Sequence, residues 1–103
     1  MRFIVEAKVP LEAGNTEILN NSLMHLKQNY LTEIKPEAAY FTLKEGQRTM
    51  FAVVDIESVN KLPATLEPLW LNLKCDVQVY PAMVFEDFQK AKEDFEKILS
   101  KRK

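Results

Sequence analysis

The chain has 103 residues, 47% of them hydrophobic and 10% aromatic, which is typical of a folded domain spanning residues 1–103 and not of a disordered segment. Its 14 basic and 15 acidic residues give a net charge of -1, which argues against nucleic acid or a membrane surface as a partner recognised by bulk charge. No apolar run reaches the length of a membrane span and no signal segment is recognisable, so we expect a cytoplasmic protein.

Residues 2–9 alternate between apolar and more polar side chains, which predicts a strand that ends at Pro10. The segment 11–16 is predicted to be a loop in which Asn15 provides a helix N-cap. Apolar residues then recur at steps of three and four, which indicates a helix; they are Leu19, Leu23, Leu26 and Tyr30. Because a residue before proline avoids helical geometry, this helix should stop just before Lys35.

Two β-rich runs, Ala38–Lys44 and Arg48–Ile56, flank a glycine-containing loop at residues 45–47 and predict a hairpin. With this loop, one face of the sheet carries a mixed set of side chains: Tyr40, Thr42, Arg48, Met50, Ala52 and Val54. The other face carries a more apolar set that should meet the helices: Ala39, Phe41, Leu43, Thr49, Phe51 and Val53. A two-residue loop would slip the register and change these pairings.

The rest of the chain predicts a short helix, a strand and a last helix. In the helix at 58–71, Pro63 fits the first turn, whereas Pro68 lies inside and should distort it. Residues 74–80 predict the fourth strand, which Pro81 should stop. The last helix has one apolar stripe, formed by Val84, Phe88, Ala91, Phe95 and Ile98.

In chain order these elements read β-α-β-β-α-β plus a C-terminal helix, the order of a ferredoxin-like α+β fold. Its antiparallel sheet carries both crossover helices on one face and leaves the other face bare. That bare face would hold Ile4 together with the mixed set above, a largely apolar patch too large for a soluble monomer. We therefore predict a homodimer that packs face to face, with the last helix contributing to the assembly.

Segments along the whole chain resemble the dimeric α+β barrel superfamily, which includes muconolactone-isomerase-like and antibiotic-biosynthesis-monooxygenase-like proteins. Within it, the chain looks like an uncharacterised bacterial family of similarly short proteins. The matching segments are 35–42, 46–49, Asp55, 63–64, 67–68, 81–83 and 86–87. The resemblance implies a small ligand, often aromatic or a lactone, between the open sheet face and the surrounding helices. It also implies that catalytic residues differ between branches.

Tyr40 and Arg48 are the first candidates for contacting such a ligand, because both are predicted on one sheet face. A phenol and a forked guanidinium would hold a carboxylate or an enolate-like oxygen. The alternative is that Arg48 lies extended at the hairpin end and Tyr40 packs across the dimer.

Three further candidates lie on the predicted helices. Glu67 and Trp70 flank the proline distortion, where a buried carboxylate would serve as a general base; the alternative is an exposed Glu67 and a core Trp70. His25 lies at the edge of the first helix's apolar stripe and would carry protons near neutral pH, or would have no such task.

The sequence predicts no metal site and no cofactor. With its single histidine, it lacks the histidine pairs seen in haem-degrading or chlorite-processing relatives. Cys75, in a strand-like run, is expected to be a small buried hydrophobe and not a nucleophile. Two functions stay open: a non-enzymatic binding or dimerisation module, and a cofactor-independent isomerase, lyase or monooxygenase acting on a small ligand.

Overall fold

The computed structural model describes residues 1–102, and four strands and five α-helices are assigned in them. The strands are β1 (Arg2–Val9), β2 (Ala38–Lys44), β3 (Gln47–Asp55) and β4 (Asp76–Ala82). The helices are α1 (Leu11–Leu19), α2 (Leu23–Ile34), α3 (Leu62–Leu73), α4 (Phe85–Lys90) and α5 (Lys92–Ser100), with a short 3₁₀ turn, η1 (Val59–Lys61), before α3. Within the part of the chain described, no helix is long and apolar enough to cross a membrane.

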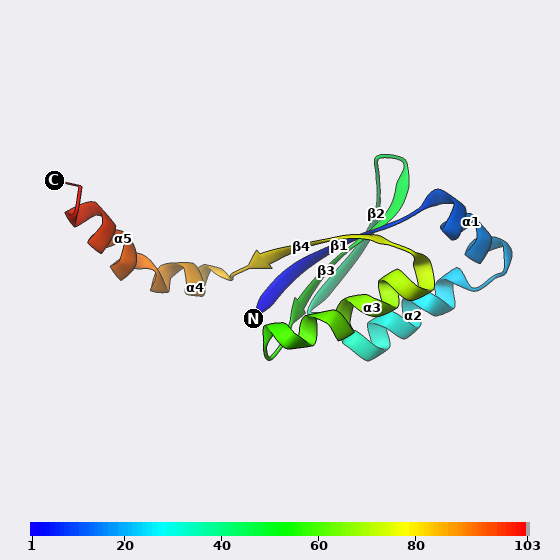
Figure 1. Cartoon of the computed structure of the whole chain (residues 1–103), viewed down its shortest axis with the longest axis horizontal. Coiled ribbons are helices and arrows are strands. Elements are labelled where there is room, and N and C mark those ends of the chain that lie inside the picture. The colour runs from blue at the N-terminus through cyan, green and yellow to red at the C-terminus, as the bar shows by residue number, and fades with distance from the viewer. Residues whose placement is uncertain (103) are drawn as a thin grey trace.

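The four strands form one antiparallel sheet in the order β2-β3-β1-β4. The two long helices, α2 and α3, lie side by side on one face of this sheet (Figure 1). This arrangement confirms the predicted ferredoxin-like α+β fold. It leaves the opposite face of the sheet without a covering helix, as predicted.

The core lies between the sheet and these two helices. Val5 of β1 pairs with Ala52 of β3, and Ala7 with Met50. The two central strands therefore present neighbouring apolar side chains to the helices. Helices α2 and α3 pack against these strands with buried side chains that lie one or two turns apart, namely Leu23, Tyr30, Leu66, Leu69 and Leu73. Full burial of each such leucine contributes about 1.5–3 kcal/mol.

The hairpin between β2 and β3 differs from the predicted one. Lys44 pairs with Gln47 across a two-residue turn, in which both Glu45 (φ 54°) and Gly46 (φ 77°) have positive φ. Positive φ at both positions is what a type I′ turn requires, and this turn matches the twist of the strands. The predicted three-residue loop was therefore wrong by one residue.

This one-residue shift exchanges the two faces of β3, because successive side chains of a strand point in opposite directions. Arg48, Met50, Ala52 and Val54 share the helix-covered face with Phe41, and the predicted placement of these four on the open face was wrong. The open face instead carries Ile4, Tyr40, Thr49, Phe51 and Val53.

Two helix predictions also need correction at the N-terminal end. Residues 11–16, predicted to be a loop, belong to α1. The predicted single helix is two, because Asn21 (φ 59°) adopts a left-handed conformation between α1 and α2. Leu19 consequently lies outside the apolar stripe of α2 and is 85% exposed. The predicted end before Lys35 is confirmed, since α2 ends at Ile34.

Prolines in the second half of the chain have different effects. The predicted positions of Pro63, in the first turn of α3, and of Pro68, inside that helix, are confirmed. Pro81, however, does not stop β4 but pairs with Phe3 inside it. Because β4 is an edge strand, a residue without an N–H is tolerated there. The strand begins at Asp76, after Lys74 closes α3 in a left-handed conformation.

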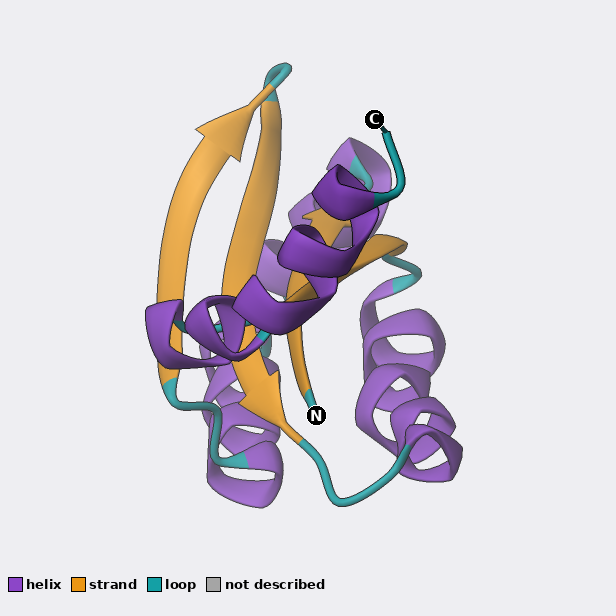
Figure 2. Cartoon of the chain, turned by 90° about the vertical axis from the view of Figure 1, so that its left-hand side faces the viewer, coloured by secondary structure: helices purple, strands orange, loops and turns teal. Residues whose placement is uncertain are grey.

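The C-terminal helices form an arm that projects from the body. In Figure 1 they run from the end of β4 away from the other helices, and Figure 2 looks at the molecule from the side of this arm. The chain therefore measures 63 × 28 × 19 Å along its principal axes. The predicted last helix is divided at Ala91 into α4 and α5, and its stripe of apolar side chains is mostly exposed.

Candidate functional site

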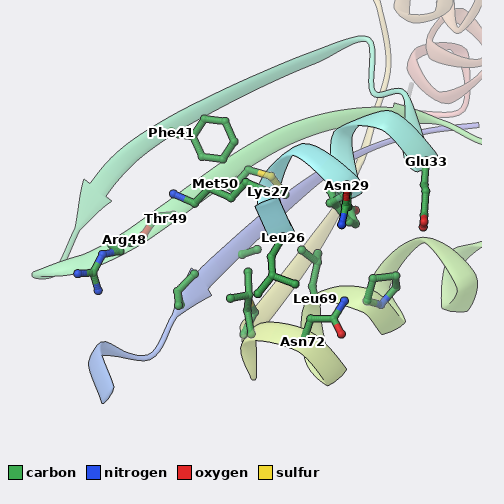
Figure 3. Close-up of a pocket in the computed structure, with 16 residues that line it drawn as sticks. Leu26, Lys27, Asn29, Glu33, Phe41, Arg48, Thr49, Met50, Leu69 and Asn72 are labelled. Atoms are coloured by element: carbon green, nitrogen blue, oxygen red, sulfur yellow. The ribbon is translucent and has the colours of Figure 1, made fainter. Parts of the chain in front are cut away.

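A cleft of about 130 Å³ lies between α2, α3 and the sheet (Figure 3). Apolar side chains form most of its floor and walls, namely Ala7, Val9, Leu26, Met50, Leu69 and Leu73. An apolar cavity of roughly 150 Å³ is large enough to hold a benzene ring. The cleft is slightly smaller than that, so a single ring is the largest ligand that its size suits.

Tyr30 fixes the two helices that form the cleft. Its hydroxyl donates a hydrogen bond to the backbone carbonyl of Thr65, at 2.9 Å, and so joins α2 to α3. Burial raises the pKa of Tyr30 to about 12. The phenol is thus protonated at neutral pH and serves as a donor that holds the walls of the cleft together.

Arg48 lies at one end of the cleft, where β3 begins and where it pairs with Val9. Its Nη2 donates to Oδ1 of Asn15 at 3.1 Å. Its Nη1 is buried and is the one such side-chain nitrogen or oxygen without a hydrogen-bond partner within residues 1–102. A buried N–H group left without an acceptor costs about 1–3 kcal/mol, and more when it is charged.

Gly14 of α1 makes the space for this guanidinium. A Cβ atom at Gly14 would lie 2.5 Å from Nη1 of Arg48, closer than real contacts allow. Helix α1, which sequence analysis took for a loop, therefore positions Arg48 twice: through the absent side chain of Gly14 and through the amide of Asn15.

A second cation, Lys27 of α2, lies beside Arg48. Its Nζ is 4.8 Å from the centroid of the Phe41 ring, a cation–π distance. Burial, and then the charge of Arg48, lower the pKa of Lys27. Neither Lys27 nor Arg48 has an ion-pair partner among the residues described. This end of the cleft therefore favours an anion from outside the chain.

The far end of the cleft is polar in a different way. Asn29, Glu33 and Asn72 line it, well separated from Arg48 in Figure 3. Cys75 also lines the cleft and is buried, as the sequence predicted. Burial raises the pKa of the Cys75 thiol to about 11, so the thiol is neutral at physiological pH and is not activated as a nucleophile.

Only one of the five candidate residues from the sequence lines this cleft, and that residue is Arg48. The expectation that Tyr40 shares its face was wrong, because Tyr40 pairs with Phe51 and is 69% exposed on the open face. Glu67, Trp70 and His25 are exposed on α3 and α2 outside the lining of the cleft.

Sequence analysis missed Lys27 although the signal was present. Lys27 lies four residues after Leu23 and three before Tyr30, which places it on the buried stripe of α2. It was not predicted as a site residue, because the charged end of a lysine in such a position usually extends to solvent. Phe41 was placed correctly on the helix-covered face, but its contact with Lys27 depends on tertiary structure.

A separate charged cluster lies on the open face. Glu6 is only 3% exposed there, and both of its carboxylate oxygens accept hydrogen bonds from Nζ of Lys44, at 3.1 Å each. Tyr80 donates to the same carboxylate at 3.4 Å. Nζ of Lys8 lies 3.9 Å from this carboxylate and 3.2 Å from that of Glu45. The hydrogen bond to Glu6 raises the pKa of Lys44.

Comparison with known proteins shows the fold and nothing finer. No family model and no curated protein matches the chain. Among solved structures, it is similar to the 5-chloro-2-hydroxyhydroquinone dehydrochlorinase TftG from Burkholderia phenoliruptrix AC1100, in complex with 2,5-dihydroxybenzoquinone. The TM-score is 0.62 at 17% identity, covering 81% of this chain and 94% of TftG.

Two further structures are similar at lower scores. They are the de novo designed protein Ferredog-Diesel (TM-score 0.47, 7% identity, 79% of this chain and 85% of that one) and a proposed antibiotic biosynthesis monooxygenase from Deinococcus radiodurans (TM-score 0.43, 12% identity, 82% and 94%). No conclusion rests on these two. The likeness to TftG confirms the fold that the resemblance implied: this chain has a ferredoxin-like α+β architecture.

Proposed function

We propose that this protein binds a small, single-ring organic anion in the cleft between α2, α3 and the sheet, and does so as a homodimer. Arg48 is the anchor for the anionic group, which is an aromatic carboxylate or the oxygen of an acidic enol. The observation that carries the proposal is the buried Nη1 of Arg48, which has no acceptor within residues 1–102.

The cost of burying that cation is what a ligand would offset. A guanidinium presents paired N–H donors in a plane and binds planar anions through two parallel hydrogen bonds. In Arg48, Nη2 donates to Asn15, whereas Nη1 is buried beside Gly14 and has no acceptor within residues 1–102. Lys27 adds a second positive charge, and the apolar floor matches the face of a ring.

The ligand of the similar structure supports the size and chemistry proposed. TftG is in complex with 2,5-dihydroxybenzoquinone, a single planar ring with acidic hydroxyl groups. Such a compound, or a benzoate, would fill a cleft of about 130 Å³ and present an anionic oxygen to one end. We propose this class of ligand for the chain here, without carrying over the reaction.

The homodimer is proposed on the apolar surface that the open face and the arm expose. Tyr40 and Tyr80 are 69% and 45% exposed, and Ile4, Phe51 and Val53 lie between them only half-buried. A two-fold related copy would cover this surface. Light scattering should report twice the monomer mass, and a monomer at micromolar concentration would contradict the dimer. The composition likewise favours the cytoplasm, which imaging of a tagged chain would test.

A cofactor-independent enzyme is the second candidate, and the lowered pKa of Lys27 is the observation that favours it. A lowered pKa enlarges the fraction of deprotonated amine, and such an amine beside a bound ketone would take a proton from a neighbouring carbon and return it to another, as an isomerase does. No electron acceptor is needed for that step. Exchange of deuterium from solvent into a bound cyclic ketone, lost in Lys27→Met, would favour the enzyme.

The binding proposal is tested by thermal shift with benzoate and salicylate, and with neutral benzamide as the control ligand. We expect the two anions to stabilise the wild-type protein and benzamide to have little effect. Arg48→Met should abolish the shift, because the anchor is removed while the side-chain length is kept. Arg102→Met, which removes an exposed arginine, is the matched control and should keep it. Equal shifts in the Arg48 variant and the wild type would overturn the proposal.

A further inference from the structure

The C-terminal arm, residues 85–100, carries an apolar stripe that is largely exposed within residues 1–102. A long ion pair joins the arm to the body, from Arg2 Nη1 to Asp87 Oδ2 at 3.9 Å. Phe88 and Phe95 lie one above the other on the stripe with ring centroids 5.7 Å apart, and both are about half exposed. Helices of fewer than about 12–15 residues are marginal alone in water. The arm therefore needs a surface to pack on.

A groove elsewhere on the molecule has the matching chemistry. It is about 530 Å³ in volume and lies between α1, α2 and β2. Its apolar lining includes Ile18, Met24, Phe41 and Leu43, each between 47% and 77% exposed. It opens beside the ligand cleft, with which it shares Lys27, Phe41 and Arg48.

The charges of the two surfaces are complementary. Residues 85–100 of the arm carry five carboxylates and three ammonium groups. The lining of the groove carries two cations, Lys27 and Arg48, and no carboxylate among its described residues. Packing the aromatic pair of the arm against the groove would bring acidic side chains toward cations that lack ion-pair partners in their own chain.

The arm does not lie near the groove of its own chain. It leaves the sheet where Ala82 pairs with Arg2, whereas Arg48 of the groove pairs with Val9 at the opposite end of β1. The eight residues of β1 separate these ends by about 23 Å. From its exit the arm points further away (Figure 1). A second copy of the chain is therefore the occupant to which the geometry points.

We propose that the C-terminal arm of a second copy packs into this groove, with the Phe88–Phe95 pair closing the mouth of the ligand cleft next to Lys27 and Arg48. This inference rests on the proposed ligand function and extends it. The ligand site is then shared, because one copy supplies the anion anchor and the other supplies the aromatic cover.

Cross-linking between differently tagged, co-expressed full chains tests this arrangement. One chain carries Met24→Cys in the groove and the other Ala91→Cys, which lies between the two phenylalanines on the arm. We expect a short bis-maleimide to join them into a product of twice the mass. Gln89→Cys, two residues before Ala91 on α4 and about half a turn around the arm, is the matched control and should cross-link at least severalfold less with Met24→Cys. The native Cys75 is buried and serves in all variants as the background.

Other packing sites for the arm would give distinct cross-linked products, and each of these products would overturn the inference. Cross-linking of Ala91→Cys to Ile4→Cys would place the arm on the open sheet face of the other copy. Efficient joining of two Ala91→Cys chains would show that arm packs on arm. A monomer, or equal yields from Ala91→Cys and Gln89→Cys, would also exclude arm-in-groove packing.

The benzoate shift is measured in the same samples, so the two proposals fail separately. An Arg48-dependent shift without the cross-link would leave the ligand function standing and remove only the shared site. A cross-link without any shift would support the arm packing and remove the ligand function on which the shared site depends.

Discussion

The two faces of the sheet each carry a cluster of charged side chains, and the clusters are opposite in kind. On the open face, the carboxylate of Glu6 is buried but has hydrogen bonds from Lys44 and Tyr80. On the helix-covered face, Arg48 and Lys27 are half-buried, and no carboxylate is paired to them among the described residues. The first cluster is electrostatically complete, whereas the second is not.

This difference indicates which cluster is structural and which serves a ligand. Buried charge is expensive unless it is paired and hydrogen-bonded, so a chain keeps an unpaired buried cation only where something else pairs with it. A polar side chain in a cleft thus points to a ligand when it has no partner within the described residues. The Glu6 cluster looks more like an active site by composition, with an acid, two lysines and a tyrosine, yet its partners already satisfy it.

Removing the Glu6 carboxylate should have the largest effect on stability. Glu6→Gln places a neutral amide opposite Lys44 and Lys8 in place of the buried carboxylate, and so removes the charge that these amines contact. We expect this change to lower the melting temperature. Calorimetry on the ligand-free protein measures it. Glu45→Gln, which breaks only the exposed contact with Lys8, is the matched control and should cost less than about 1 kcal/mol.

The same variant separates the two clusters functionally. Glu6→Gln should keep the full stabilisation by benzoate, since the open face is not part of the cleft. Loss of the benzoate shift in this variant would mean that the two faces are coupled and that the comparison between them is wrong.

Arg48→Met should act in the opposite direction on the ligand-free protein. Replacing an unpaired buried cation by an apolar side chain of similar length is neutral or stabilising, by about 0–1 kcal/mol here, because the lost bond to the exposed Asn15 offsets part of the gain. Calorimetry again measures the change. A clear loss of stability would show that Arg48 is a structural residue and would remove the reason for proposing a ligand.

Gly14→Ala tests whether the position of Arg48 matters and not only its presence. The added methyl group would displace Nη1, so benzoate affinity should fall severalfold, less than in Arg48→Met. Stability should hold, since alanine is favoured over glycine in a helix by up to about 1 kcal/mol. Thr16→Ala, on the exposed part of the same helix, is the control for an alanine in α1 and should leave affinity unchanged. Unchanged benzoate affinity in Gly14→Ala would show that the space Gly14 leaves for Arg48 has no role in binding.

The fold was predictable from the sequence because it depends on periodicity. Alternation in residues 2–9 and steps of three and four in 23–34 are local patterns that survive in the structure. The site was not predictable from the sequence, because the face on which Arg48 lies depends on a turn of two residues instead of three. Glu45 had to adopt a positive φ, which is unusual for a glutamate, and that single choice moved Arg48 from the open face into the cleft. A pattern of residue types does not specify which of two neighbouring turns closes a hairpin.

The smallest effect expected is on the pH dependence of binding, through Lys27. Its pKa in the ligand-free protein lies below the usual 10.5, because of burial and the charge of Arg48. A bound anion favours the protonated amine and raises this pKa again, so binding is accompanied by proton uptake once Lys27 begins to deprotonate. Benzoate affinity should therefore be constant at lower pH and decline as pH rises through the pKa of free Lys27. Lys27→Arg keeps the positive charge at all these pH values and should flatten the decline while retaining the affinity, as titration calorimetry at several alkaline pH values would measure. A decline that persists unchanged in Lys27→Arg would mean that another group titrates with the ligand, and would separate Lys27 from the anion site that Arg48 anchors.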